Sequence, residues 1–461
     1  MAITYQRQMT DAEGLMWRME KDPYLSSNIV NVTILDRSPD FDLFRQRMER
    51  AAMVMPRLRQ VVRSAPGNVS APTWVDDSDF SLDRHVRRIA LPKGSSDRDL
   101  FDLATLIAAE PFDRARPLWQ YTIVEGLKGN RAAMIHKLHH TIADGESGVA
   151  LSLEYLDFER DAVPPPMPDA PADGDDDADD QAAADQVRDL IAGSLRIPLG
   201  IAKQVKELLL DPTQIPAATE AAGNTLRGIV SQLSDTDAAR SPLWTDRSTR
   251  RHLEVASAPF TETKAAAKHL GGTLNNAFVT IAAEAASRYH VEFGAPVESL
   301  RTSMAISTRT DDSGANAFSL VRMLVPTGEM PIDERFRAIK EAADGALAGS
   351  ASANLDQMAT FASTLPTSVI CRLARQQSQT VDFATSNVRG SPVPMYLAGA
   401  QLVANYPVGP LSGVAFNLTL LSYLGRLDMG LNTDPAAIEH PDALARLLGE
   451  SVDDFVALAP T

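Results

Sequence analysis

Apolar residues in the first third of the chain recur with two periods, one typical of helices and one typical of strands. Over 41–53 they recur in steps of three and four, which predicts a helix with one buried face. Val30, Val32 and Ile34 alternate instead, which predicts a strand over 28–36. The same spacings predict helices over 11–21 and 97–109 and strands over 57–62, 72–75 and 118–124. Mixed elements of this kind indicate an α/β (α+β) fold.

A further strand, predicted over 132–138, ends in two adjacent histidines, His139 and His140. Successive side chains on a strand point to opposite faces, so we expect the two imidazoles to diverge. Asp144 and Gly145 follow at the place where a new helix is expected to begin. Two imidazoles and a carboxylate therefore lie together at a strand-to-helix junction, where side chains commonly project into a cleft.

The chemistry of this junction follows from the residue types. Histidine titrates near neutral pH, so it can take a proton from an alcohol or thiol and pass it on. Asp144 can orient His140, or it can turn away and brace the loop against an arginine. A covalent acyl-enzyme is not indicated, because no G-x-S-x-G elbow lies nearby and Cys371 has no recognisable nucleophile context.

Two other interpretations of the junction remain. In one, both histidines are surface or capping residues and Asp144 is a helix N-cap. In the other, they bind a metal. We expect no metal here, because adjacent histidines diverge on a strand and the HExxH spacing is absent.

The remaining elements follow the same two periods. We expect helices over 148–158 and 260–270 and another that opens at Leu274, a strand over 304–309, and strands of the second half over 402–410 and 416–424. Two closing helices are predicted over 442–448 and 452–458.

Composition divides the chain into two parts. At 461 residues it is long for a single core, so two domains are expected, 1–160 and 250–461. Between them, 161–249 reads as a connector. Its first part, 161–180, holds eight aspartates and no lysine or arginine, which predicts a flexible acidic linker. An amphipathic stretch over 187–210 follows, which can pack across the two domains or rest on lipid.

The charge and the single cysteine limit the partners and the cellular compartment that we expect for the protein. The net charge of −16 argues against nucleic acid as a partner, and half of it comes from the acidic linker. One cysteine fits a reducing compartment. The N-terminus shows no signal-peptide core, and no apolar run is long enough to span a membrane. We therefore expect a cytoplasmic protein.

The pattern His139-His140-Thr141-Ile142-Ala143-Asp144-Gly145 is HHxxxDG. It resembles the active-site motif of acyl-CoA-dependent acyltransferases related to chloramphenicol acetyltransferase and to peptide-synthetase condensation domains. Upstream, Pro117-Leu118-Trp119 followed by Glu125-Gly126-Leu127 resembles the PLW…GL segment of one branch, the bacterial wax ester synthase/diacylglycerol acyltransferase family. The resemblance covers nearly the whole chain apart from the acidic linker.

Three later segments also resemble this family. Residues 274–279 are similar to its LNDVVLA segment, with Asn276 in place of the usual Asp, and Asn275 either caps the helix or contributes to the site. Residues 304–309 resemble its strand ending in S-x-R, whose Arg309 can pair with Asp144. Residues 385–390 resemble its SNVPGP segment, here a predicted loop with Arg389 in place of Pro.

The resemblance implies two chloramphenicol-acetyltransferase-like domains, each a mixed sheet with helices, and a tunnel between them. His140 is then the base, and His139, Asp144 and Gly145 complete the motif. Asn275, Ser386 and Asn387 are candidates to bind substrate or the oxyanion, and Arg309 is a structural support.

The implied reaction is transfer from acyl-CoA to diacylglycerol, or to a fatty alcohol to give a wax ester. Acyl-CoA is a substrate, and no cofactor is expected. The protein is expected in the cytoplasm, at the surface of a membrane or of lipid droplets. Two alternatives stay open: an acyltransferase for a polyketide or other specialised alcohol, and a weakly catalytic lipid-binding or droplet-associated homologue.

Overall fold

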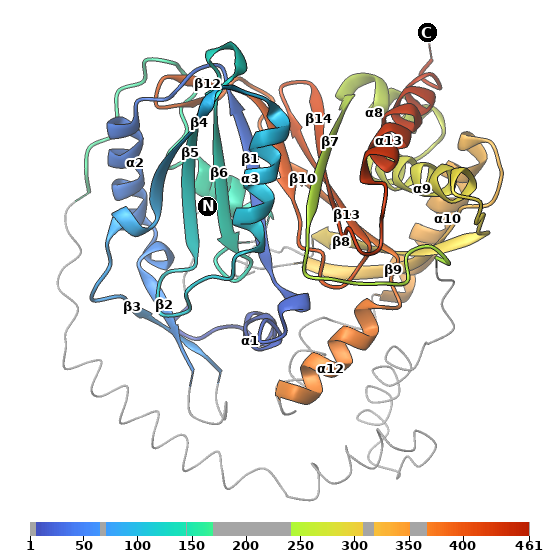
Figure 1. Cartoon of the computed structure of the whole chain (residues 1–461), viewed down its shortest axis with the longest axis horizontal. Coiled ribbons are helices and arrows are strands. Elements are labelled where there is room, and N and C mark those ends of the chain that lie inside the picture. The colour runs from blue at the N-terminus through green and yellow to red at the C-terminus, as the bar shows by residue number, and fades with distance from the viewer. Residues whose placement is uncertain are drawn as a thin grey trace, which may run out of the picture.

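The computed structural model describes residues 6–64, 71–143, 145–168, 241–307, 318–350 and 367–460, some of them by their backbone alone. Two six-stranded sheets stand side by side, each with helices packed on it (Figure 1). Both sheets mix parallel and antiparallel neighbours, which confirms the mixed sheets and the α/β (α+β) class that were expected. The acidic linker and the amphipathic stretch fall largely within 169–240, outside the described residues.

The first sheet has the strand order β11-β12-β1-β6-β5-β4. Its strands are β1 (Asn28–Leu35), β4 (Val86–Ser95), β5 (Trp119–Leu127), β6 (Ala132–His139), β11 (Tyr396–Leu397) and β12 (Ala400–Val408). A separate two-stranded sheet is formed by β2 (Gln60–Arg63) and β3 (Thr73–Asp76). The strands expected in the first third of the chain are thus confirmed, with shifts of a few residues at their ends.

The second sheet has the order β7-β14-β13-β10-β8-β9. Its strands are β7 (His252–Pro259), β8 (Ser299–Ser307), β9 (Phe318–Pro326), β10 (Phe383–Arg389), β13 (Phe416–Tyr423) and β14 (Arg426–Thr433). Residues 385–389 therefore belong to a central strand and not to the predicted loop. This prediction was wrong because β10 pairs in parallel with β13 along its whole length.

One strand from the second half of the chain, β12, belongs to the first sheet. The sequence predicted that 402–410 would be a late strand of the second domain, but β12 pairs antiparallel with β1 in the first sheet. It still touches the second sheet, because Asp428 of β14 accepts a hydrogen bond from the Asn405 backbone N–H at 2.9 Å. Periodicity reveals a strand but not its partner, so local sequence could not predict this pairing.

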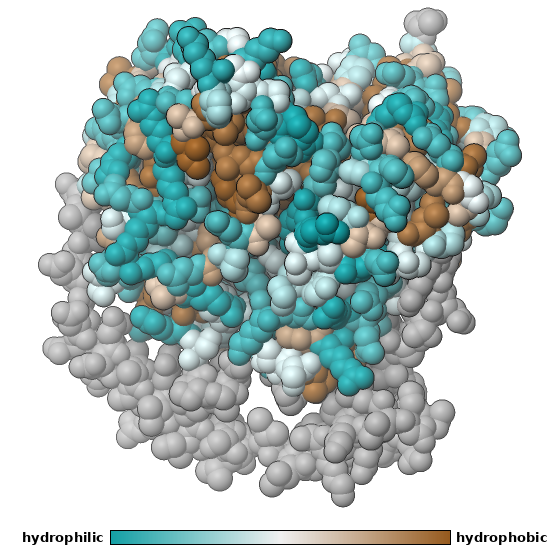
Figure 2. Space-filling model, in the orientation of Figure 1, coloured by the Kyte–Doolittle hydropathy of each residue, from teal (hydrophilic) through white to brown (hydrophobic). Residues whose placement is uncertain are grey.

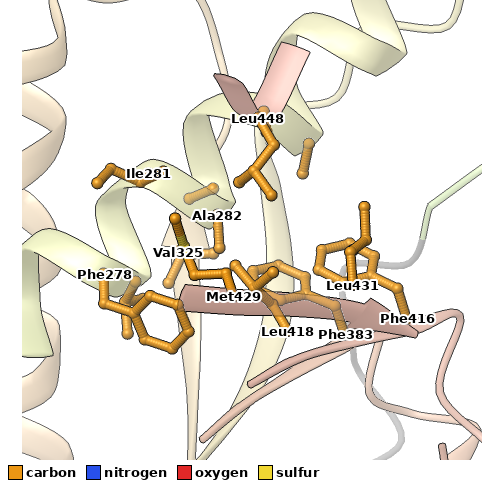
Figure 3. Close-up of a cluster of buried hydrophobic side chains, with 14 of the residues drawn as sticks. Phe278, Ile281, Ala282, Val325, Phe383, Phe416, Leu418, Met429, Leu431 and Leu448 are labelled. Atoms are coloured by element: carbon orange, nitrogen blue, oxygen red, sulfur yellow. The ribbon is translucent and has the colours of Figure 1, made fainter. Parts of the chain in front are cut away.

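Helices pack on and around the two sheets (Figure 1). They are α1 (Asp11–Met19), α2 (Phe41–Val54), α3 (Asp97–Ala109), α4 (Gly145–Ser152), α8 (Phe260–His269), α9 (Leu274–Glu292), α10 (Ile332–Ser350), α12 (Thr367–Ser378) and α13 (Pro441–Val456). Figure 3 shows how Phe278, Ile281 and Ala282 of α9 face Leu418 of β13 and Leu448 of α13 in the second core.

Two predicted helices differ from the structure. The helix expected over 148–158 ends at Ser152, because Asp157 forms a β-bridge with Tyr396 and so pulls the chain towards β11. The two closing helices are one, α13, whose buried positions continue past Gly449 on one face. A glycine inside a helix costs only about 1 kcal/mol, which packing of that face offsets.

The first sheet buries its two faces differently. Val30, Val32 and Ile34 pack with α3 in one cluster, so their predicted common face is confirmed. The other face packs with α2, where Phe44 and Met48 meet Tyr121 of β5. Part of this second face, towards the second sheet, is not filled by side chains and forms a cavity.

Most of the face seen in Figure 2 is hydrophilic, with hydrophobic residues gathered between α2 and α3 and over the helices of the second half. In the described parts of the chain, no helix combines the length and apolar character needed to cross a membrane.

The crossing of β12 over β14 allows a direct test. A Cβ added to Gly430 would lie 2.0 Å from the carbonyl oxygen of Pro407, and neither backbone can move freely. We therefore expect Gly430→Ala to lower the free energy of unfolding by about 3 kcal/mol or more, measured by urea denaturation. Gly449→Ala is the control, because a Cβ there meets nothing within 4 Å and should stabilise the helix by about 1 kcal/mol. Equal effects would contradict the close crossing.

Candidate functional site

A cavity of about 1480 Å³ lies between the two sheets. It exceeds the roughly 300–1,000 Å³ of ordinary small-molecule pockets. One wall is the inner face of the first sheet, the opposite wall comes from β8, β9, β10 and β13, and α1, α4, α8 and α12 supply further lining. Most of the lining is apolar, so the cavity suits long hydrocarbon chains better than a polar metabolite.

Strand β6 brings His140 to this cavity. Met134, His136, Leu138 and His140 all line it, at intervals of two residues. The backbone N–H of His140 donates to the carbonyl of Ser27 at 3.0 Å, which extends the pairing of β6 with β1 by one residue. The strand period therefore places the second histidine of the motif on the open face of the sheet.

His139 points to the opposite, packed face, as the alternation predicts. Its side chain is fully buried and is absent from the cavity lining. Its Nδ1 accepts a hydrogen bond from the Thr141 backbone N–H at 3.1 Å, and its Nε2 lies 2.7 Å from Oε2 of Glu20. The Thr141 N–H assigns the proton to Nε2, which then donates to the carboxylate. His139 is a structural residue that holds the end of β6.

Glu20 terminates α1 and had no signal in the sequence. Its carboxylate also accepts the Ser27 backbone N–H at 3.3 Å, so it ties α1 to the residue that pairs with His140. Burial by itself would raise the pKa of Glu20, but the hydrogen bond from His139, the Ser27 backbone N–H and the positive charge of Arg114 together lower it. Glu20 is therefore ionised at neutral pH and anchors the histidine junction.

Asn275 lies across the cavity from the first sheet. It lines the cavity, and its amide Nδ2 contacts Sδ of Met304 at 2.7 Å. It does not cap α9; the cap is Thr273, and Asn276 closes a capping box by accepting the Thr273 backbone N–H at 2.9 Å. The cap interpretation of Asn275 was wrong by two residues. An amide oxygen is enough for this box, so the departure from Asp at Asn276 costs it no hydrogen bond.

Strand β10 presents Ser386 and Asn387 to the same cavity. It pairs with β8 only from Phe383 to Thr385, so among the described strands none covers that edge of β10 beyond Thr385. Arg389, which replaces the usual proline of the resemblance, lies in the same strand and lines the cavity too. The edge can offer side-chain and backbone donors to a substrate carbonyl.

The other motif residues are placed only in part. Gly145 begins α4, as the sequence predicted for a helix start. Asp144 and Arg309 lie outside the described residues, so their pairing stays a prediction. His136 and Asn31 also line the cavity and were missed, because nothing in their local sequence marks them.

Comparisons with known proteins agree with this geometry. The family model of the wax ester synthase/diacylglycerol acyltransferase catalytic domain matches residues 9–278, and that of the WS/DGAT C-terminal domain matches 314–455. The chain belongs to the wax ester synthase/diacylglycerol acyltransferase family. It is therefore an acyltransferase, which requires an acyl donor and an acceptor.

Relatives cover the chain almost end to end. A Mycobacterium tuberculosis protein whose name assigns it to the diacylglycerol O-acyltransferases is 32% identical over 96% of this chain and 91% of its own length. The solved wax ester synthase/diacylglycerol acyltransferase of Marinobacter aquaeolei VT8 matches with a TM-score of 0.67 at 19% identity, covering 98% of this chain and all of that one.

A more distant structure has the same fold. The first condensation domain of the calcium-dependent antibiotic synthetase matches with a TM-score of 0.60 at 14% identity, covering 99% of this chain and 97% of that one. The fold expected from the HHxxxDG resemblance is thus confirmed.

The contact between Glu20 and His139 can be tested by stability measurements. Glu20→Ala leaves a buried imidazole N–H without its acceptor, so we expect a loss of about 1–3 kcal/mol in the free energy of unfolding at pH 7. Because folding lowers the pKa of Glu20 below its ordinary value of 4.5, the contribution of its charge is present above that pH and is lost as the pH falls below it.

The difference between wild type and Glu20→Ala should therefore shrink in acid. Glu49→Ala, which removes an exposed carboxylate from α2, is the matched control and should change stability by less than about 0.5 kcal/mol. A difference for Glu20→Ala that is small at pH 7, or independent of pH, would contradict the structural role of this pair.

Proposed function

We propose that this protein transfers the acyl group of a long-chain acyl-CoA to the free hydroxyl of diacylglycerol, and that it also accepts fatty alcohols to form wax esters. The observation that carries the proposal is the position of His140 in a large, mainly apolar cavity between the two sheets. A family that joins acyl chains to alcohols needs one cavity that admits two long hydrocarbon substrates, and this geometry supplies it.

His140 acts as general acid and base in a single transfer. Its imidazole takes the proton of the acceptor hydroxyl while the oxygen attacks the thioester carbonyl carbon. The resulting oxyanion then expels the CoA sulfur as the C–S bond breaks. The imidazolium returns its proton to that sulfur, so the products are an ester and free CoA. No residue of the protein becomes acylated.

The oxyanion needs donors opposite His140. Ser386, Asn387 and Asn275 line the same cavity as His140, and beyond Thr385 the edge of β10 that no described strand covers can add backbone N–H groups. Preorganised donors of this kind stabilise developing charge strongly in a cavity from which water is excluded. Asp144 is assigned to the support of the loop, with Arg309 as its partner.

We further propose that the protein works in the cytoplasm at the surface of a membrane or lipid droplet. Support comes from the segment after α4, where the apolar side chains of Leu153, Phe158 and Val163 are mostly exposed, while Leu153 also lines the cavity. Exposed apolar side chains of this kind can enter a lipid surface. Phe158→Asp should weaken cosedimentation with diacylglycerol-containing vesicles, and unchanged cosedimentation would argue against this contact.

The catalytic proposal is tested by thiol release from palmitoyl-CoA with diacylglycerol or hexadecanol as acceptor. We expect acceptor-dependent release that falls by roughly 10²–10⁴-fold in His140→Ala. His269→Ala, an exposed histidine on α8, is the matched control and should keep full activity. Full release in folded His140→Ala would remove His140 as the base. Absence of release with either lipid, alongside release with another alcohol, would reassign the acceptor.

A further inference from the structure

The wall of the cavity that the first sheet forms carries a row of polar side chains, here called the polar row, at some distance from His140. In the register of the first sheet, His136 of β6 lies opposite Asn31 of β1, and Asn31 lies opposite Pro407 of β12. All three line the cavity. His136 is four residues from His140 along extended chain, which corresponds to about 13 Å.

Apolar residues separate this row from the reacting centre. The neighbouring pair towards His140 is Leu138 and Ile29, and both line the cavity. A substrate that runs along the sheet from His140 therefore crosses a hydrocarbon surface before it reaches His136 and Asn31. The polar row is a separate feature of the cavity and not an extension of the histidine motif.

The row carries unused hydrogen-bonding capacity. Asn31 is only 6% exposed, and its Nδ2 donates to Thr33 Oγ1 at 2.9 Å and to Asn405 Oδ1 at 3.2 Å. Among the described residues, neither Oδ1 of Asn31 nor Nδ1 of His136 has a hydrogen-bond partner. Buried polar atoms without partners cost about 1–3 kcal/mol each, so two of them on residues that line a cavity indicate a ligand group that could satisfy them.

The hydrogen-bonding groups of His136 and Asn31 favour an uncharged ligand group. His136 keeps part of its surface open to the cavity, yet it lies deep enough that desolvation lowers its pKa to about 4. The imidazole is therefore neutral at physiological pH, with one donor and one acceptor nitrogen. Asn31 adds an acceptor oxygen. A hydroxyl group, which both donates and accepts, matches this set, whereas neither His136 nor Asn31 would offer a positive charge to a carboxylate or phosphate.

We propose that His136 and Asn31 form a second polar subsite, which binds a hydroxyl carried by the hydrocarbon chain of one substrate, remote from the ester bond that forms. This inference rests on the proposed acyl transfer and narrows its substrates to chains with an oxygen far from the reacting end. Such a hydroxyl can belong to the acyl donor or to the acceptor alcohol, and the two sources can be separated.

Two series of substrates show whether the acyl donor or the acceptor alcohol carries this hydroxyl. In the first, isomers of hydroxyhexadecanoyl-CoA, with the hydroxyl at successive carbons, react with hexadecanol. In the second, hexadecanoyl-CoA reacts with hexadecanediol isomers that differ in the position of the second hydroxyl. We expect kcat/KM in one series to peak at a mid-chain position, roughly tenfold above the unsubstituted substrate, as two net hydrogen bonds imply.

Variants test whether His136 and Asn31 cause the preference for a mid-chain hydroxyl. Asn31→Leu and His136→Phe should each abolish the peak, because each removes a hydrogen-bonding partner while keeping a similar volume. Leu138→Met, in the adjacent apolar row, is the matched control and should keep the ratio between hydroxylated and plain substrates. The series that shows the peak identifies which substrate carries the hydroxyl.

Two results would overturn the subsite. One is turnover of plain substrates without a peak in either series, which would mean that the row holds only water. The other is a peak that survives in both Asn31→Leu and His136→Phe. If plain substrates are not turned over, the proposed function has failed, and calorimetric binding of hexadecanol and its diols then decides the subsite by itself. Equal affinities for all of them would reject it.

Discussion

The structure depends on the insertion of β12 from the second half of the chain into the first sheet. It pairs with β1 and also contacts β14 closely, so it joins the two sheets. The cavity exists because the sheets are joined at this strand while their inner faces are left partly unfilled beyond it. Residues far apart in sequence, such as His140 and Ser386, therefore line one space.

Along β6, the two-residue period of a strand separates the side chains that pack from those that face the cavity. Odd-numbered residues pack: Lys137 and His139 are buried, and His139 is held by Glu20. Even-numbered residues line the cavity, and His140 is the last of them. The paired histidines thus have different roles. The imidazole of His139 fixes the end of the strand, and this positions His140 in the cavity. A shift of one residue in the pairing would exchange the two roles.

Much of this could be predicted from the sequence, because its signals are local. The helix over 97–109 and the divergence of His139 and His140 follow from periodicity, and the family follows from a compact motif. The pairing of β12 and the Glu20 contact could not be predicted, because each depends on a partner more than 100 residues away. The mistaken loop at 385–390 is a shorter-range case, since it is the parallel pairing with β13, from Phe383 with Phe416 onward, that shows it to be a strand.

The proposed reaction brings both substrates together in one cavity, where His140 moves a proton and no residue is acylated. Intact-protein mass spectrometry after rapid mixing with palmitoyl-CoA tests it most directly. We expect an unmodified protein mass without acceptor, and ester formation only once diacylglycerol or hexadecanol is added. An adduct of the palmitoyl mass that forms without acceptor, and is then chased into ester when acceptor arrives, would contradict direct transfer.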